Sequence, residues 1–562
     1  MKFNNVAEIL ASNLKKHVKD VFMLTGYGAM YLNDALKDSG MNFYVSRNEA
    51  AAPMMAEAYA KAVNKVSAVC VTAGPGATNA LPGLAEAYVD SAPIIILSGQ
   101  VERKYTTNFY EKYNIRSFGI AEFSIAEAIK KFTKYSVTIT NPYNCLYELE
   151  KSIYLAQEGR KGPVWIEVPL DIQSFKITDK KKIKKFHLPK KKKSNLDLQK
   201  FFYYFKKSEK PVFIIGNGIK QSGAKKIFKE VNNILKIPFL TSRFACDLFP
   251  YSKKTNMGLI GIKGQTYNEK ILKNTDLIIS LGCRLAPALT INDKNFLSKK
   301  TKKIIVDIDK SSLNHPLIKF DKKYEVDVKK FLFKLKKNLT IKKNIINKPK
   351  YNWLKFCENL KKNNQIALIN KKNNPIDLYR FMFLLNKNSK KNSIFTNDAG
   401  SNYYVGGQSW FFENGQTEIC SSTNAAMGLS VPLSIGAAIA CPKKQVISVT
   451  GDGSIELNIQ ELKTISHYKL NIKTFVINNG GYASMRNWQD NVFDGNRIDT
   501  KKLTGVGTLN FKNIAKAFNM KYFLIKNENQ IINSLNYILS KSEPYLIEVV
   551  TNPNQKIIGV EI

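Results

Sequence analysis

Residues 446–489 read VISVTGDGSIELNIQELKTISHYKLNIKTFVINNGGYASMRNWQ, and the order of features in this stretch decides the fold. A β-branched apolar run, Val446–Thr450, leads into the turn Gly451–Ser454. Helical spacing of apolar residues follows, and a second apolar run, Lys473–Ile477, ends in the turn Asn478–Gly481. A strand, a turn, a helix and a second strand in this order predict two parallel strands joined by a helix.

The two turns carry the side chains of an anion and metal site. Gly451 and Gly453 let the backbone approach a phosphate closely, and a helix that begins after Ser454 would offer free N–H groups. Asp452 and Asn479 supply oxygen atoms, which Mg²⁺ prefers as ligands. Both residues follow strands, where open α/β sheets bind their ligands. This segment therefore predicts a diphosphate held through a divalent cation.

The same alternation of strand-like runs and helical patterns extends along the chain. It predicts an α/β fold with three doubly wound parallel-sheet domains. The predicted domains are residues 1–175, 194–335 and 365–562. Two basic linkers are predicted between them, at residues 176–193 and 336–364.

Composition excludes several classes of protein. The 562 residues are 44% hydrophobic and 23% charged, which is typical of globular domains and not of disordered chains. No apolar run approaches the roughly 20 residues of a membrane span, and residues 1–20 lack the apolar stretch of a signal peptide. We therefore expect a cytoplasmic protein that does not bind a membrane.

The formal net charge of +41 invites a nucleic-acid interpretation. Lysine dominates the basic residues, and its excess extends over the whole chain. The densest run, Lys180–Lys193, falls between two domain-like patterns, where a solvated linker is the simpler interpretation. We therefore predict no nucleic-acid partner.

The segment from GDG to NN resembles the signature of the thiamine diphosphate-dependent enzymes, in which NN follows GDG at about this interval. Within that family the chain is most similar to the acetolactate synthase catalytic subunits. The resemblance implies three domains in the order pyrimidine-binding, middle and diphosphate-binding, with thiamine diphosphate and Mg²⁺ as cofactors. It also implies a decarboxylating carboligase that joins pyruvate to a carbonyl acceptor, with sites formed between the subunits of a homodimer or homotetramer.

The resemblance assigns a catalytic role to Glu49, in VSRNEAAAPMMAEAYAK, as the acid that faces the aminopyrimidine ring of the cofactor. From the residues alone, Glu49 would be an acid in the first turn of a helix that interacts with the helix dipole. The turn Gly74–Asn79 matches another family stretch and implies that Pro75 and Asn79 lie near the cofactor. A strand-to-helix turn explains its glycines equally well.

The third block adds further cofactor contacts by the same resemblance. Gly400, Ser401 and Asn402 match the second phosphate-binding turn of the family. Met427 matches the bulky apolar residue that supports the bent cofactor, although a core methionine is the alternative. The remaining residues that we assign to the cofactor or metal are Gly451, Asp452, Gly453, Ser454, Asn479, Gly481 (as a carbonyl ligand) and Tyr482.

The substrate is less well determined. Trp488 matches a tryptophan that shapes the acceptor pocket in acetolactate synthases, and Tyr27 lies in a glycine-rich loop that faces the active centre. Tyr27 departs from the acetolactate synthase pattern, and Ala121 stands where many relatives have a glutamine. Two alternatives stay open, which are an acyloin synthase that transfers an acetyl unit to a keto-sugar nucleotide and a simple 2-oxo-acid decarboxylase.

FAD is weakly disfavoured as a further cofactor. Acetolactate synthases carry a non-redox FAD in the middle domain, and the loops at Ile215–Gly218 and Leu281–Arg284 keep the general shape of that domain. No G-x-G-x-x-G pattern is present, and the stretch after Arg284 lacks the arginine and aspartate residues of flavin-binding members.

Overall fold

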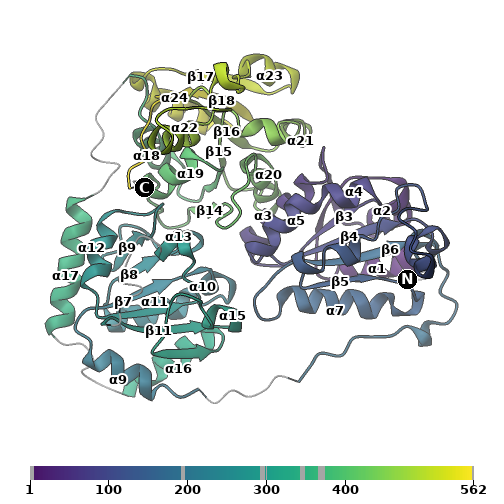
Figure 1. Cartoon of the computed structure of the whole chain (residues 1–562), viewed down its shortest axis with the longest axis horizontal. Helices are drawn as coiled ribbons and strands as arrows, with labels where there is room; N and C mark the ends of the chain where they lie inside the picture. The colour runs from purple at the N-terminus through teal and green to yellow at the C-terminus, as the bar shows by residue number, and fades with distance from the viewer. Residues whose placement is uncertain are drawn as a thin grey trace.

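The computed structural model describes residues 5–190, 196–290, 298, 300–341, 348–364 and 374–559. In this part of the chain, three six-stranded sheets form, and every strand pair in them is parallel. Helices cover the sheets, and the three units lie around a common centre (Figure 1). The predicted fold class, three α/β parallel-sheet domains, is confirmed.

The first sheet has the strand order β2-β1-β3-β4-β6-β5. Its strands are β1 (Asp20–Met23), β2 (Asn42–Val45), β3 (Ser67–Val71), β4 (Ile94–Gln100), β5 (Tyr135–Thr138) and β6 (Val164–Pro169). The main helices around it are α1 (Val6–Leu14), α2 (Met30–Asp38), α3 (Ala51–Val63), α5 (Leu81–Val89) and α7 (Cys145–Gln157). Strands β3, β4 and β6 are buried along their whole length, as parallel strands covered on both faces must be.

The middle sheet has the order β12-β11-β10-β7-β8-β9. Its strands are β7 (Pro211–Ile215), β8 (Phe239–Thr241), β9 (Asn256–Leu259), β10 (Leu277–Leu281), β11 (Lys302–Asp307) and β12 (Lys322–Glu325). The helices include α9 (Gln199–Lys207), α10 (Asn217–Gln221), α11 (Lys225–Leu235), α12 (Tyr267–Asn274) and α16 (Val328–Ile341). From β7 the chain adds β8 and β9 on one side, and it then returns to add β10, β11 and β12 on the other side. The boundary between β7 and β10 is therefore the switch point at which open α/β sheets form a ligand crevice.

The third sheet repeats the strand order of the first, as β14-β13-β15-β16-β18-β17. Its strands are β13 (Ile394–Asn397), β14 (Thr417–Ile419), β15 (Val446–Gly451), β16 (Ile472–Asn478), β17 (Lys521–Ile525) and β18 (Tyr545–Val550). Its helices are α18 (Leu378–Asn388), α19 (Ser401–Ser409), α20 (Ser430–Ala440), α21 (Glu461–His467), α22 (Ala483–Val492), α23 (Phe511–Ala517) and α24 (Ile531–Ser540). The pairing of β15 with β16 brings the two predicted turns to the same edge of the sheet.

The predicted linker at 336–364 is wrong for the described part of that segment. Helix α17 (Lys348–Asn363) lies there, and its residues Trp353, Leu354 and Cys357 are buried in the core of the middle domain. The indole N–H of Trp353 also donates to the carbonyl of Pro211 at 3.0 Å. An apolar helical face hidden among many lysines explains the error. Residues 342–347, like 191–193 of the other linker, lie outside the described residues.

The single helix predicted after Ser454 is divided. A 3₁₀ turn, η9 (Ile455–Asn458), precedes the separate helix α21. The turn is tightened by a bond from Leu457 N to Ser454 O at 3.3 Å. A short 3₁₀ turn has a much smaller dipole than the helix we predicted, so its contribution to anion binding is correspondingly smaller.

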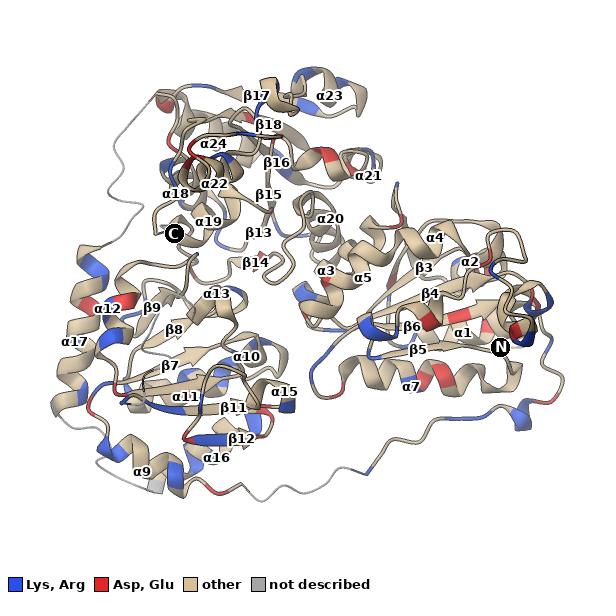
Figure 2. Ribbon diagram, viewed as in Figure 1, with Lys and Arg blue, Asp and Glu red and all other residues tan. Residues whose placement is uncertain are grey.

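Basic residues lie on elements of all three domains (Figure 2). This distribution agrees with a compositional excess of lysine rather than one basic surface. None of the helices in the described ranges combines the length and the hydrophobicity that a bilayer-spanning segment needs.

The first and third domains meet through helices α3 and α20. Both helices belong to one continuous core that extends across the two domains. The closest approach is at Gly436, where a Cβ atom would lie 1.9 Å from the carbonyl oxygen of Met55. The two backbones can therefore cross only because residue 436 has no side chain.

Replacement of Gly436 by valine should force α3 and α20 apart. We expect the Gly436→Val substitution to lower the free energy of unfolding by about 1–3 kcal/mol, the usual cost of overpacking, as measured by urea unfolding. The matched control is Gly507→Ala, because no heavy atom lies within 4 Å of a Cβ at Gly507. Equal unfolding curves for the two variants would contradict this account of the interface.

Candidate active site

The carboxylate of Asp452 lies at the centre of the predicted metal site. Its Oδ2 accepts the N–H groups of Asn479 at 3.1 Å and Gly481 at 2.9 Å, and its Oδ1 accepts that of Gly453 at 3.0 Å. Burial raises the pKa of Asp452, and these N–H donors oppose the rise. Two of the residues it contacts, Asn479 and Gly481, are those predicted with it as metal ligands.

The loop at Asn479–Gly481 depends on its glycines and on Arg486 of α22. Gly480 and Gly481 have φ values of +75° and +114°, which side chains of L-residues rarely adopt. The guanidinium of Arg486 donates to the carbonyls of Asn479 (2.7 Å) and Gly480 (3.1 Å). It also donates to those of Thr500 (2.6 Å) and Pro553 (2.9 Å). Arg486 therefore ties the loop to two other segments of the chain.

The start of α19 faces the GDG turn. Gly400 has φ +77°, and a Cβ on it would lie 3.3 Å from Ser484 Oγ of α22. A Cβ on Gly451 would lie 3.5 Å from the side-chain nitrogen Nδ2 of Asn402. Helix α19, the GDG turn and the start of α22 thus surround one position at the carboxyl edge of the third sheet.

Three buried side-chain oxygens around this position have no hydrogen-bond partner among the described residues. They belong to Ser401, Asn402 and Asn479. Buried polar atoms of native proteins are nearly always paired, so unpartnered oxygens in one place indicate a missing ligand. Groups of three or more His, Cys, Asp or Glu residues that could hold a metal are absent from the described residues. The site instead offers a carboxylate, an amide and backbone carbonyls, a donor set that suits Mg²⁺.

Tyr482 and Met427 border the same turn. A Cβ on Gly453 would lie 2.4 Å from the ring of Tyr482, so the ring packs directly on the GDG backbone. Met427 is half-buried, and its neighbour Gly428 donates its N–H to the hydroxyl of Ser454 at 3.0 Å. Ser454, predicted to bind the cofactor, therefore also contacts the segment that carries Met427.

Glu49 lies at the carboxyl edge of the first sheet. It is 9% exposed, and its carboxylate accepts the side-chain amide of Asn79 at 3.2 Å. A Cβ on Gly76 would lie 3.4 Å from the other carboxylate oxygen, so the turn after β3 packs against the acid. Pro75 begins helix α4 (Pro75–Asn79) in this turn and is itself exposed. The structure thus brings Glu49 and Asn79 together, as predicted, on the first domain.

Glu461 of α21 connects the segment before Glu49 to the third domain. Its carboxylate accepts the N–H groups of Arg47 at 2.8 Å and Asn48 at 3.1 Å. Glu461 is fully buried, and burial raises its pKa. Glu49 is therefore positioned by a residue that lies only eight positions after the last glycine of the GDG turn.

The two predicted substrate residues are more exposed. Tyr27 is 72% exposed in the 3₁₀ turn η1 (Tyr27–Ala29), and Trp488 of α22 is 39% exposed. The backbone of Gly28 lies against Ala73, next to the turn that carries Asn79. Ala121 also touches this turn, because a Cβ on Gly74 would lie 2.4 Å from the Ala121 carbonyl oxygen.

A separate cleft lies at the point where the middle sheet reverses direction. Its cavity volume is about 150 Å³. Gly218 N donates to the carbonyl of Gly282 at 2.9 Å, which joins the loops after β7 and β10 at the base of the cleft. Four basic residues line it, and burial lowers the pKa of one of them, Lys263, to about 8. The other three are Arg160, Arg243 and Arg284.

Sequence reasoning missed Arg486 and Glu461. The GDG-to-NN pattern locates the turns but contains no information on which distant carbonyls an arginine will reach. Glu461 lies on the predicted helix at a position that looks like an ordinary surface acid. The roles of all the predicted site residues remain predictions, although their side chains gather at two sheet edges.

Loss of the Arg486 side chain should loosen the loop at Asn479–Gly481. The Arg486→Met substitution leaves four carbonyls without this donor, and each unsatisfied buried group costs about 1–3 kcal/mol. We expect at least about tenfold weaker affinity for thiamine diphosphate with Mg²⁺, measured by titration calorimetry. Arg497→Met is the matched control, because Arg497 pairs with Asp490 at the surface. Equal affinities for the two variants would show that Arg486 does not support the loop.

Three family descriptions match this chain. "Thiamine pyrophosphate enzyme, N-terminal TPP binding domain" matches residues 4–118. "Thiamine pyrophosphate enzyme, central domain" matches residues 198–335. "Thiamine pyrophosphate enzyme, C-terminal TPP binding domain" matches residues 398–549. The last match includes the GDG turn, the NN turn and the start of α19.

Similar proteins cover nearly the whole chain. The acetolactate synthase large subunit of Lactococcus lactis is 28% identical over 98% of this chain and 93% of its own length. A probable acetolactate synthase large subunit of Methanocaldococcus jannaschii is 30% identical over 95% of this chain and 90% of its own. With the three domain matches, these similarities show that the chain belongs to the thiamine diphosphate-dependent enzymes, in the group of acetolactate synthase large subunits.

Proposed function

We propose that this protein is a Mg²⁺-dependent carboligase that joins two molecules of pyruvate to form acetolactate, with loss of CO₂. The proposal extends the family assignment to a metal, a substrate and a product, and it includes the cytoplasmic location predicted from the sequence. The observation that carries it is the set of unpartnered buried oxygens on Ser401, Asn402 and Asn479, beside the carboxylate of Asp452.

The residues of this site fit a metal-bound diphosphate. Asp452, Asn479 and the carbonyl of Gly481 would hold Mg²⁺, and the start of α19 would contact the phosphates. In this structure the carbonyl of Gly481 accepts the N–H of Ala483 at 3.0 Å, so it would exchange this partner for the metal. When bound, thiamine diphosphate supplies a thiazolium carbon that adds to the carbonyl of a 2-oxo acid.

Glu49 would act on the other end of the cofactor. A carboxyl group beside a ring nitrogen can share a proton with it and so shift the basicity of the opposite amino group. Glu49 has the burial and the fixed backbone for this role, because Glu461 fixes the preceding residues and Asn79 contacts its carboxylate.

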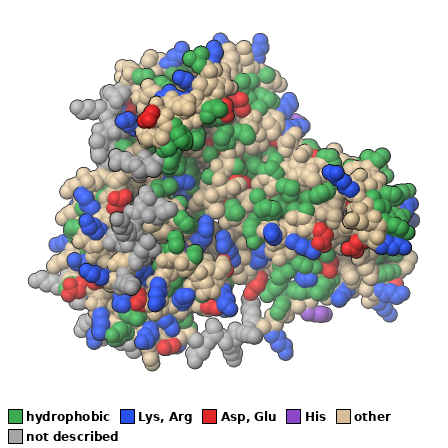
Figure 3. All heavy atoms as spheres, viewed as in Figure 1, with side chains coloured by type: hydrophobic (Ala, Val, Ile, Leu, Met, Phe, Trp, Pro, Cys, Tyr) green, Lys and Arg blue, Asp and Glu red, His purple; other side chains and the backbone are tan. Residues whose placement is uncertain are grey.

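We also propose that the working unit contains a second copy of the chain. Large apolar side chains near both sheet edges are exposed: Ile120 by 94%, Ile498 by 76% and Leu503 by 89%. Hydrophobic side chains are visible at the surface in Figure 3. A homodimer or a dimer of dimers would cover these exposed apolar side chains.

FAD stays weakly disfavoured on the sequence argument. The cleft at the reversal point of the middle sheet offers the opposite argument, since basic residues line it where open α/β sheets bind their ligands. A visible absorption spectrum of the purified protein decides between them, and we expect no flavin bands.

An acyloin synthase that uses a keto-sugar nucleotide is the second candidate, and one observation favours it. Ala121, which contacts the turn at Gly74, has a small side chain where many relatives have a glutamine. A smaller side chain at this position would suit a larger acceptor. A simple decarboxylase, the third reading, would need no acceptor pocket.

Product analysis separates these activities. We expect purified protein with pyruvate, Mg²⁺ and thiamine diphosphate to release one CO₂ and form one acetolactate for every two pyruvate molecules consumed. Acetaldehyde as the sole product would assign a decarboxylase. A coupled product that forms only when a keto-sugar nucleotide is added would assign the acyloin synthase. Absence of CO₂ release from pyruvate and from other 2-oxo acids would overturn the proposed function.

The Glu49→Gln substitution should separate turnover from cofactor binding. Because the amide cannot exchange a proton as the carboxyl does, we expect turnover to fall by about 10²–10⁴-fold. Affinity for the cofactor should stay within a few fold of the original, because the diphosphate site is intact. Glu127→Gln, on an exposed ion pair of the same domain, should leave both unchanged. Full turnover in Glu49→Gln would remove Glu49 from the mechanism.

A further inference from the structure

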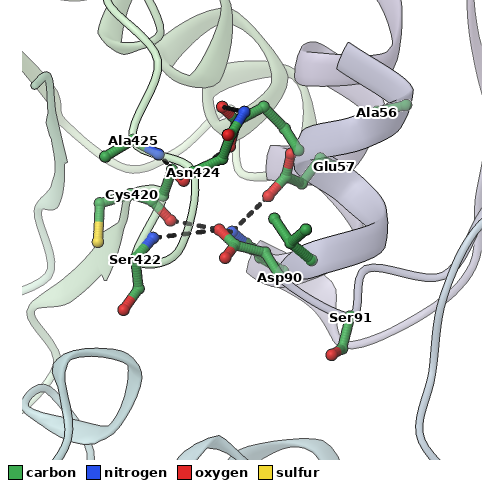
Figure 4. A network of polar contacts seen from close by, with 12 residues as sticks. Ala56, Glu57, Asp90, Ser91, Cys420, Ser422, Asn424 and Ala425 are labelled. Atoms are coloured by element: carbon green, nitrogen blue, oxygen red, sulfur yellow. Dashed lines mark hydrogen bonds and ion pairs between the residues drawn. The ribbon is translucent and has the colours of Figure 1, made fainter. Parts of the chain in front are cut away.

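The segment Cys420–Ala426 of the third domain lies against a cluster of four charged residues of the first domain (Figure 4). These four residues are Glu57 and Lys61 of α3, Glu86 of α5, and Asp90. All four belong to helices, or helix ends, that pack in the core shared by the two domains. The segment ends immediately before Met427.

Lys61 and Asp90 contact the beginning of this segment. The Lys61 ammonium pairs with Glu57 at 2.5 Å and Asp90 at 3.0 Å, and it donates to the carbonyl of Cys420 at 2.9 Å. Asp90 accepts the N–H of Ser422 at 3.3 Å. Burial raises the pKa of Glu57, whereas the neighbouring carboxylates hold the pKa of Lys61 above its usual value despite burial.

Glu86 contacts residues along the whole segment with its two oxygens. Oε2 accepts the hydroxyl of Ser421 at 2.7 Å. Oε1 accepts the side-chain amide of Asn424 at 2.8 Å and the N–H of Ala426 at 3.2 Å. Glu86 is fully buried, and burial raises its pKa while these donors oppose the rise. A buried carboxylate with three donors, all from one segment of another domain, is a specific arrangement.

These contacts bracket Met427. Glu86 accepts the N–H of the preceding residue, Ala426, and Ser454 accepts that of the following residue, Gly428. The segment also needs such partners, because Ala425 has φ +53°, a conformation that residues other than glycine rarely adopt. Ala425 N donates to the Ser421 hydroxyl at 3.0 Å, so the residue that contacts Glu86 also stabilises the unusual turn.

We propose that Glu86 is a positioning residue that fixes Met427 against the cofactor from the first domain, an inference that rests on the proposed role of Met427. Glu86 does not touch the reacting atoms. It fixes the backbone on one side of Met427, while Ser454 of the GDG turn fixes the other side. The bent form of the cofactor then depends on a contact between domains as well as on the diphosphate site.

The test uses the full-length protein with Glu86→Ala and Glu86→Gln. In the cofactor-free protein, hydrogen–deuterium exchange followed by mass spectrometry measures the amides of residues 420–428. With cofactor bound, the exchange of its thiazolium carbon proton into D₂O reports whether the bent form is kept. A titration measures the affinity for the cofactor. Glu167→Ala is the matched control, since Glu167 is a buried carboxylate of the same domain that accepts Gln100 and Thr138.

In Glu86→Ala we expect the amides to exchange at least tenfold faster and the thiazolium proton at least tenfold more slowly. The cofactor affinity should change less than threefold, because the diphosphate site is untouched. In Glu86→Gln both exchange rates should stay within threefold of those of the original protein, because the amide oxygen still accepts hydrogen bonds from Asn424 and Ala426. The proposal would be overturned if Glu86→Ala kept the amide and thiazolium exchange rates of the original protein. It would also be overturned if Glu167→Ala changed both rates in the same way.

Asn424→Ala tests the same contact from the third domain if Glu86→Ala does not fold. Asn424 is exposed, so its loss should leave the fold intact. We expect the amides of residues 420–428 to exchange two- to fivefold faster and the thiazolium proton to exchange two- to fivefold more slowly. Rates equal to those of the original protein would overturn the proposal. Neither exchange measurement needs a 2-oxo acid. Failure of the original protein to speed the thiazolium exchange would count against Glu49 and the proposed function, while the amide rates of the 420–428 segment would still decide the role of Glu86.

Discussion

A buried carboxylate is tolerated only where hydrogen-bond donors surround it, and three such groups determine how this site is assembled. Asp452 accepts N–H groups of the loop at Asn479–Gly481. Glu461 accepts those of the two residues before Glu49. Glu86 accepts donors from the segment before Met427. In each case the charge specifies the course of a loop, because any other course would leave the carboxylate without partners.

Two of these three carboxylates act between domains. Glu461 reaches from the third domain to the first, and Glu86 reaches from the first to the third. Helices α3 and α20 cross at the interface of these two domains, with Gly436 against the backbone of Met55. Glu49 and Met427, the predicted acid and the predicted support of the cofactor, therefore both depend on this domain interface. A change at that interface would therefore shift both residues at once.

The sequence predicted the sheets and the turns well because apolar strands and glycine turns are local patterns. The runs at Val446–Thr450 and Lys473–Ile477 are strands, and they bring Asp452 and Asn479 together as expected. The functions of Arg486 and Glu86 could not be predicted, since their partners lie far away in the chain. Helix α17 was missed because its apolar residues stand among many lysines, which gives a weak pattern.

The first and third domains share one strand order, and α3 and α20 follow corresponding strands, β2 and β14. Equivalent elements that pack on each other are the hallmark of an isologous contact between identical subunits. The polypeptide thus contains, within a single molecule, a contact between equivalent helices of two domains with the same strand order. Glu49 and Met427 lie just before those equivalent helices, so the two predicted site residues occupy comparable positions on the two sides of this contact.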